Sequence, residues 1–150
     1  MSKKQQALSR LSMPAIKLFV NQVQHCQQVS DRGSSPLYEW VCCGISGQEG
    51  LGLSQVWLQG YIVKLFDDNN DFLLDDGTGV AHITGVNKLV KNVLFKEGMY
   101  VMIAGQLKTL LSSVGHPLVR VLKISDLTKS SLAEPHWILE VIDSQLHTTQ

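Results

Sequence analysis

The side chains that could do acid–base or nucleophilic chemistry are spread thinly along this 150-residue sequence. No serine or cysteine stands in the strand-to-helix sequence that exposes a nucleophile, and the acid pair Asp75–Asp76 falls in a turn rather than a predicted cleft. The histidines stand far apart from one another: His25, His82, His116, His136 and His147. We therefore expect no catalytic triad and predict that the chain is not an enzyme.

The three cysteines also argue against a metal centre. Their number is odd, two are adjacent, and no pair has the C-x-x-C spacing of a zinc site or a redox motif. Free cysteine usually behaves as a small buried hydrophobe in a reducing compartment. We expect this role for Cys26, Cys42 and Cys43, with no disulfide framework, no metal and no cofactor.

Two acidic segments resemble ion or phosphate loops but lack the residues that such loops need. "DDNNDF" (67–72) has the alternating Asp and Asn of a calcium loop, yet Phe72 and Thr78 stand where that loop requires glycine and glutamate. "DDGTG" (75–79) has no following lysine to bind a phosphate. Asp, Asn and Gly favour turns, so both segments are predicted to be turns.

Composition excludes several classes of protein. Thirteen Lys and Arg balance thirteen Asp and Glu, so the chain lacks the positive charge of a protein that binds mainly phosphates. An apolar fraction of 44% excludes a mainly disordered chain. Charged residues make up only 17%, against roughly 25% in typical soluble domains, which favours a partly covered surface. No apolar run approaches membrane-spanning length and the N-terminus lacks a signal core, so neither a membrane protein nor a secreted one is expected.

Short strands separated by turns make up the middle of the sequence. The expected strands are at 36–45, 54–66, 72–76, 80–86, 98–107 and 117–127. Gly60 and Gly105 lie inside two of these strands, where glycine typically marks the sharp bends of a closed barrel. A short helix is expected at 87–95, before the fourth barrel strand.

This order predicts an all-β fold: a five-stranded OB-fold, which is a small Greek-key barrel, with a C-terminal α-helix. A half-open sandwich is the alternative, but it explains the interior glycines less well. Residues 1–12 are expected to form a flexible N-terminus, and residues 13–150 a single domain that includes the helix at about 131–147. Within that domain, the segment Met13–Cys26 fits either a helical stripe or a short strand.

The C-terminal helix begins with a capping-box pattern, Ser131 followed by Glu134, and has Pro135 in its first turn. Its apolar side chains point in several directions, so one barrel cannot bury all of them. Exposed apolar patches usually mark interfaces, and a tryptophan with aliphatic neighbours is typical of an interface centre. We therefore predict a partner-binding surface with these helix residues: Trp137, Ile138, Val141 and Ile142. The alternative is that residues 14–26 of the same chain cover the helix.

Single-strand nucleic-acid binding is the competing function for an OB-fold. It requires aromatic platforms on the second and third strands and cations along the groove. The corresponding sequence, "FLLDDGTGVAHITGV" (72–86), offers Phe72 and His82 but no Lys or Arg, and Phe72 is more typical of a core position. Four cations elsewhere form at most a weak patch: Lys64, Lys108, Arg120 and Lys123.

Five motifs occur in the same order in one small family: "SQVWLQGYIV", "LDDGTG", "GMYVMIAGQL", "VLKISDL" and "HWILEV". On these motifs the sequence resembles the family of the second, smaller RecQ-mediated genome instability protein, a single OB-fold subunit. The resemblance covers residues 56–143 well and residues 14–20 more weakly. The "YV-x-x-AG-x-L" strand and the "ILEVI" helix are also similar to the OB domain of the middle subunit of replication protein A.

The resemblance implies a non-catalytic, nuclear role with little direct binding of nucleic acid. Family members pair with the C-terminal OB domain of the larger RecQ-mediated genome instability subunit. That pair joins a Bloom-type RecQ helicase and topoisomerase III alpha, which dissolve double Holliday junctions, and it docks a peptide of the Fanconi anaemia M-type translocase. The positions that match the family's contact surface are Lys17, Lys123 and Trp137, with the surrounding helix face. The alternative is a single-strand DNA-binding subunit of the replication protein A type.

Overall fold

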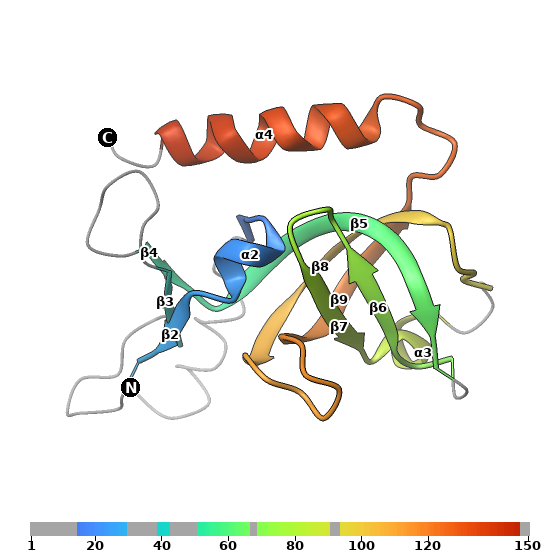
Figure 1. The fold of residues 1–150 in the computed structure, drawn as a ribbon, viewed down its shortest axis with the longest axis horizontal. Coiled ribbons are helices and arrows are strands. Elements are labelled where there is room, and N and C mark those ends of the chain that lie inside the picture. Colours follow the sequence, from blue (N-terminus) through green and yellow to red (C-terminus); the bar gives the residue numbers. More distant parts are fainter. Residues whose placement is uncertain (1–14, 30–38, 43–50, 67–68, 91–93, 148–150) are drawn as a thin grey trace.

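A computed structural model describes residues 15–29, 39–42, 51–66, 69–90 and 94–147 (Figure 1). The side chains of Leu51 and His147 are not included in this description. The flexible segment predicted at residues 1–12 and the third cysteine, Cys43, lie outside the described residues.

Five strands close into a barrel. They are β5 (Gln55–Leu65), β6 (Phe72–Asp75), β7 (Val80–Thr84), β8 (Tyr100–Thr109) and β9 (Leu118–Asp126). Pairing runs β5–β6–β7–β9–β8 and returns from β8 to β5, with β7 and β9 parallel and the other pairs antiparallel. A helix, α3 (Val86–Leu89), stands before β8, where the sequence predicts a longer one. The predicted five-stranded OB-fold is confirmed.

Closure of this barrel depends on two interior glycines. β5 pairs with β8 as far as Tyr61 and with β6 from Tyr61 onward, so the strand changes partner beside Gly60. A Cβ atom at Gly60 would lie 2.6 Å from the carbonyl oxygen of Asp75, and one at Gly105 would overlap the carbonyl oxygen of Arg120. Only glycine therefore allows the neighbouring strands to approach this closely.

The segment before the barrel forms a strand, a helix and part of a second sheet. These elements are β1 (Ile16–Lys17), which is parallel to β5, α2 (Val20–Val23), and an antiparallel sheet of β2 (Cys26–Gln28), β3 (Trp40–Cys42) and β4 (Leu51–Leu53). The sequence of Met13–Cys26 fits either a helix or a short strand, and the described part of this segment contains one of each. The strand expected at 36–45 is present as β3, in the second sheet and outside the barrel.

Aliphatic side chains fill the barrel, and the N-terminal segment adds to this core. Leu18, Val20 and Val23 are fully buried. The β6–β7 turn holds α2 in place, because Asp76 Oδ2 accepts the Val20 N–H at 2.8 Å. Phe72 is 1% exposed, so it is a core residue, as its sequence context favours.

The two described cysteines also belong to the core. Cys26 and Cys42 are buried thiols that lie opposite each other across β2 and β3. The expectation that they are buried thiols is confirmed.

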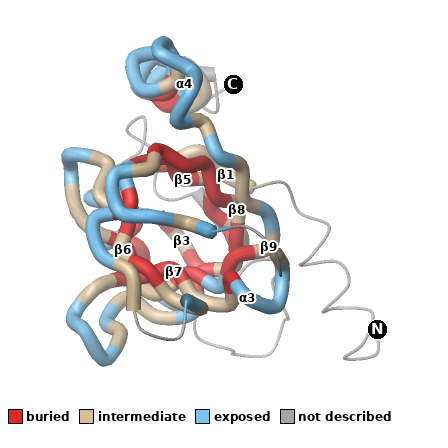
Figure 2. Tube along the Cα trace, turned by 90° about the vertical axis from the view of Figure 1, so that its right-hand side faces the viewer, coloured by how far each residue is buried: buried red, intermediate tan, exposed pale blue. Residues whose placement is uncertain are grey.

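The last element, α4 (Ala133–His147), lies against the outside of the barrel as a separate layer (Figures 1 and 2). It begins two residues after Ser131, because the Leu132 carbonyl accepts the N–H of His136. Pro135 lies in its first turn, as predicted. Among the described residues, no helix has the length and apolar character needed to cross a membrane.

Candidate partner-binding surface

Two apolar stripes run along α4 and face different ways. Trp137 and Val141 are 2% and 0% exposed and lie on the side of the barrel. The second stripe is exposed: Ile138 46%, Leu139 65%, Ile142 46% and Leu146 64%. Residues three and four apart are neighbours on a helix, so these four residues, which we call the outer stripe, form one continuous face.

Polar contacts hold both ends of α4 on the rest of the chain. Near its start, the Tyr61 hydroxyl donates a hydrogen bond of 2.6 Å to Glu134 Oε2, the residue that the capping-box pattern includes. Near its end, the side-chain amides of Gln22 and Gln145 exchange hydrogen bonds of 3.0 and 2.7 Å. These contacts fix the rotation of the helix about its own axis, and the outer stripe is consequently turned away from the barrel.

Two tryptophans form the seam between α4 and the barrel. The rings of Trp57 and Trp137 stack with centroids 6.3 Å apart. Lys17 Nζ lies 5.0 Å from the centroid of the Trp57 ring and 3.6 Å from Glu140 Oε2 on α4. Both indole N–H groups are buried and have no hydrogen-bond partner among the described residues. Buried donors are nearly always hydrogen-bonded in folded proteins, so a buried N–H without a partner can mark a place where another molecule binds.

A row of four residues crosses the outer face of the barrel beside this seam. Lys17 pairs with Trp57 across β1 and β5, Trp57 with Ala104 across β5 and β8, and Ala104 with Lys123 across β8 and β9. Paired residues share one face of a sheet, so the four side chains lie on the same face in the order Lys17, Trp57, Ala104 and Lys123. A lysine stands at each end of the row, and Trp57, next to Lys17, stacks on Trp137 of α4. We call these four residues the cross-strand row.

The sequence-predicted residues divide between the row and the helix. Lys17 and Lys123 lie in the cross-strand row, and Trp137 stacks on that row through Trp57. Ile138 and Ile142 lie on the outer stripe. Trp137 and Val141 pack against the chain's own barrel, so they support the surface from beneath rather than forming its exposed part. The role of all six residues in partner binding stays a prediction.

Sequence reasoning missed three residues of this surface. Trp57 lies in the clearest predicted strand, but only the strand register places it between Lys17 and the helix. Leu139 and Leu146 follow the helical period of Ile142, and this spacing separates the outer stripe from the buried one.

The N-terminal segment is the alternative cover for α4, and it covers only the inner side. Lys17 and Gln22 contact the helix, whereas Val20 and Val23 are buried in the core. The outer stripe stays at least 46% exposed. Within the described residues, a large apolar face of α4 is thus left to solvent.

A polar cluster joins β7 to the β5–β6 and β8–β9 loops, which are the elements that other OB-folds use for nucleic acid. His82 Nε2 lies 2.5 Å from Asp71 Oδ2, and His82 Nδ1 lies 3.1 Å from Ser112 Oγ. The three side chains are connected as in a Ser-His-Asp triad. They come from separate segments, so their proximity cannot be read from the sequence. Ser112 Oγ also accepts the N–H groups of Val114 and His116 at 3.4 Å, so it closes the β8–β9 turn. The cluster therefore joins loops around the barrel.

No group of three acidic, histidine or cysteine side chains in the described part of the chain is placed to hold a metal ion.

Comparison with known families gives a match over most of the chain. Residues 14–145 match the family model of RecQ-mediated genome instability protein 2. A relative of that name from Gallus gallus is 29% identical over 104 residues, which cover 68% of this chain and 72% of the relative. A second, from Bos taurus, is 29% identical over 102 residues, which cover 67% of this chain and 62% of the relative.

Solved structures agree with the observed architecture. A chain of a replication protein A heterotrimer bound to single-stranded DNA superposes with a TM-score of 0.63 at 13% identity, over 92% of this chain and 100% of that one. A chain of the S. pombe Stn1–Ten1 complex gives a TM-score of 0.58 at 16% identity, over 89% and 94% of the two chains. At these identities the likeness concerns the fold alone.

Proposed function

Because this chain belongs to the RecQ-mediated genome instability protein 2 family, we propose that it is a non-catalytic OB-fold subunit that binds another protein. Membership of this family makes it a genome-stability protein. The observation that carries the proposal is the outer stripe of α4, whose four large aliphatic side chains are at least 46% exposed. A continuous apolar face of this kind usually marks an interface, so we expect a partner to cover it.

We propose the C-terminal OB domain of the larger RecQ-mediated genome instability subunit as that partner. A helix with an apolar stripe on each of two sides is suited to lie between two barrels. A stable pair buries on the order of 1,600 Å² in total, which is more than one helical stripe provides. The cross-strand row beside α4, with Lys17 and Lys123, is therefore the proposed second part of the contact.

Through this partner, the chain would support a Bloom-type RecQ helicase and topoisomerase III alpha in the dissolution of double Holliday junctions in the nucleus. A peptide of the Fanconi anaemia M-type translocase would dock on the same pair. Family membership supports these assignments. The balance of thirteen cations against thirteen anions also suits a subunit that binds proteins rather than phosphates.

Co-expression with the partner OB domain tests the proposed interface. Ile142→Glu places a charge in the middle of the outer stripe, so we expect it to abolish co-purification. Leu111→Glu is the matched control, because Leu111 is 73% exposed and lies in the β8–β9 loop, away from α4. Lys123→Glu tests whether the row takes part, and we expect weaker binding.

Circular dichroism melts establish that each variant is folded before binding is scored. Co-purification of folded Ile142→Glu at the parent level would place the interface elsewhere. Loss of binding by Leu111→Glu to the same extent would indicate a general effect of added charge rather than a contact on α4.

Single-strand DNA binding is the competing function, and one feature of the groove favours it. Phe66 lies 5.6 Å from His82 between ring centroids, and Lys64 Nζ lies 5.2 Å from the centroid of the Phe66 ring. An aromatic ring with a nearby cation is the kind of platform on which bases stack. In an oligonucleotide titration we expect only the non-specific level, roughly 10⁻⁴–10⁻⁶ M. Tight binding that weakens steeply with salt would support the DNA-binding function instead.

A further inference from the structure

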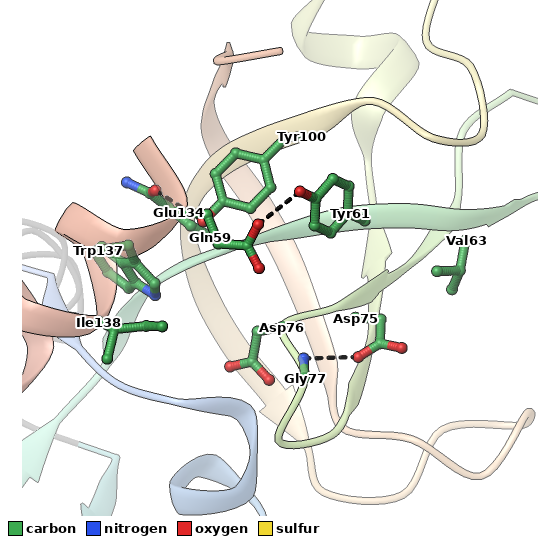
Figure 3. Close-up of a pocket in the computed structure, with 10 residues that line it drawn as sticks. All are labelled: Gln59, Tyr61, Val63, Asp75, Asp76, Gly77, Tyr100, Glu134, Trp137 and Ile138. Carbon is green, nitrogen blue, oxygen red and sulfur yellow. Dashed lines mark hydrogen bonds between the residues drawn. The ribbon is translucent and has the colours of Figure 1, made fainter. Parts of the chain in front are cut away.

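A pocket of about 310 Å³ opens between the start of α4 and the strands beneath it (Figure 3). Its floor is the outer face of β5, where Gln59, Tyr61 and Val63 follow one another at alternate positions. Tyr61 pairs with Asp75 of β6 on one side and with Tyr100 of β8 on the other, so these three residues share that face. Helix α4 and the β6–β7 turn provide the walls.

The pocket is acidic, although the chain has no net charge. Asp75, Asp76 and Glu134 line it, and no Lys, Arg or His is among its described lining residues. Burial raises the pKa of the Tyr100 hydroxyl above its ordinary value, and the charges of Glu134 and Asp76 raise it further. The three carboxylates do not form a group that could hold a metal ion. An acidic lining without a described cation attracts a positively charged group.

Two of these carboxylates use only one of their two oxygens in hydrogen bonds to the described residues. Asp76 accepts four hydrogen bonds from α2 and its own turn, so its task is structural. Asp75 Oδ1 accepts the Gly77 N–H at 2.8 Å, and Glu134 Oε2 accepts the Tyr61 hydroxyl at 2.6 Å. The second oxygen of Asp75 and of Glu134 receives no hydrogen bond from the described residues, which leaves both available to a ligand.

Trp137 provides an independent indication of a ligand. It lines the same pocket, is 2% exposed, and has an indole N–H without an acceptor in the described part of the chain. Figure 3 shows this nitrogen on the side of the ring that faces the pocket. The indole N–H is a donor only, so a small shift of the side chain would let it bind a carbonyl oxygen.

We propose that this pocket binds an arginine side chain of an extended polypeptide. The guanidinium would pair with Glu134 and Asp75 and lie against the Tyr61 ring, while a backbone carbonyl of the same polypeptide would accept the Trp137 N–H. Lysine is less suited, because its ammonium lacks the planar fork that matches carboxylates. The carboxylates repel phosphate groups and acidic peptides. This site adds a ligand class beside the outer stripe and does not depend on the identity of the partner proposed above.

Titration of the full chain, labelled with ¹⁵N, with a capped Gly-Arg-Gly peptide tests the proposal. The chain has three tryptophans, and the Trp40 N–H already donates to the Leu107 carbonyl at 3.0 Å, so its indole signal is an internal reference. We expect the Trp137 indole signal to shift and saturate while the Trp40 signal stays in place. A capped Gly-citrulline-Gly peptide keeps the shape but loses the charge, and we expect it to bind about tenfold more weakly.

Charge-neutral variants connect this binding to the pocket. Glu134→Gln and Asp75→Asn each keep an oxygen for the internal hydrogen bond and remove the charge, so we expect several-fold weaker binding of Gly-Arg-Gly. Glu140→Gln removes the same charge from α4 outside the pocket lining, and we expect less than a twofold change. Equal shifts with arginine and citrulline, or no saturation in the parent chain, would overturn the proposal. The parent titrations decide this even if a variant fails to fold.

Discussion

Tyr61 and Tyr100 lie side by side under the start of α4, with ring centroids 4.9 Å apart. The Tyr61 hydroxyl donates to Glu134, and this hydrogen bond raises the pKa of Tyr61. Tyr100 is buried and its hydroxyl donates to Gln59 Oε1 at 3.3 Å; burial and then the charge of Glu134 raise its pKa. The folded protein thus favours the neutral form of both phenols.

The raised pKa of Tyr100 predicts a loss of stability at alkaline pH. A group whose pKa is higher in the folded state contributes stability below its unfolded pKa, about 10 for tyrosine, and this contribution is lost as pH rises further. We expect the free energy of unfolding, measured by urea denaturation, to fall above about pH 10 in the parent chain. Tyr100→Phe should show a clearly smaller fall. Equal pH dependence in the two proteins would contradict the assignment to Tyr100.

At the scale of the element, α4 divides its apolar residues between two tasks. Trp137 and Val141 join the helix to its own barrel, whereas the outer stripe stays exposed. The contacts of Glu134 and Gln145 hold the helix in one rotation, so the two stripes cannot exchange places without breaking hydrogen bonds. We therefore expect substitutions at adjacent residues, such as Val141 and Ile142, to differ in their effect on the free energy of unfolding.

Alanine substitutions on α4 should separate these tasks. Trp137→Ala removes a buried ring that stacks on Trp57, so we expect it to lower the free energy of unfolding by about 3 kcal/mol. Ile142→Ala shortens a half-exposed side chain, and we expect a change within about 0.5 kcal/mol in the chain alone. Urea denaturation measures both values. Similar losses for the two variants would mean that the helix does not sit on the barrel as described.

At the scale of the whole molecule, charge and exposure act together. The formal net charge is zero, so electrostatic repulsion between copies is weak. The outer stripe presents a continuous apolar face that a second copy can cover when the proposed partner is absent. A chain with these two properties is prone to associate with itself.

We therefore predict concentration-dependent self-association of the isolated chain in sedimentation velocity. The double variant Leu139→Lys/Leu146→Lys adds charge to the outer stripe and should sediment as a monomer. The control is Leu94→Lys/Leu111→Lys, because these leucines are 76% and 73% exposed but lie outside α4, and it should associate like the parent. A parent chain that stays monomeric at high concentration would count against an unpartnered interface on α4.

Local patterns determined the elements of this protein. Alternating apolar residues identified the barrel strands, Gly60 and Gly105 indicated its closure, and an excess of apolar residues in the C-terminal helix indicated a partner. Each of these signals lies within a short window of sequence, because the side-chain periods of strands and helices are local properties. The OB-fold could therefore be predicted from the sequence, whereas the interface on the helix stays a prediction.

Tertiary structure alone decided which residues meet. Strand register placed Lys17, Trp57 and Lys123 in one row, and the rotation of α4 assigned Trp137 to the barrel and Ile142 to solvent. The pocket between Asp75 and Glu134 also depends on how the helix crosses β5. Such contacts join segments far apart in the chain. These contacts depend on how the barrel closes and how the helix docks on it, and neither can be deduced from the local periodicity of the sequence.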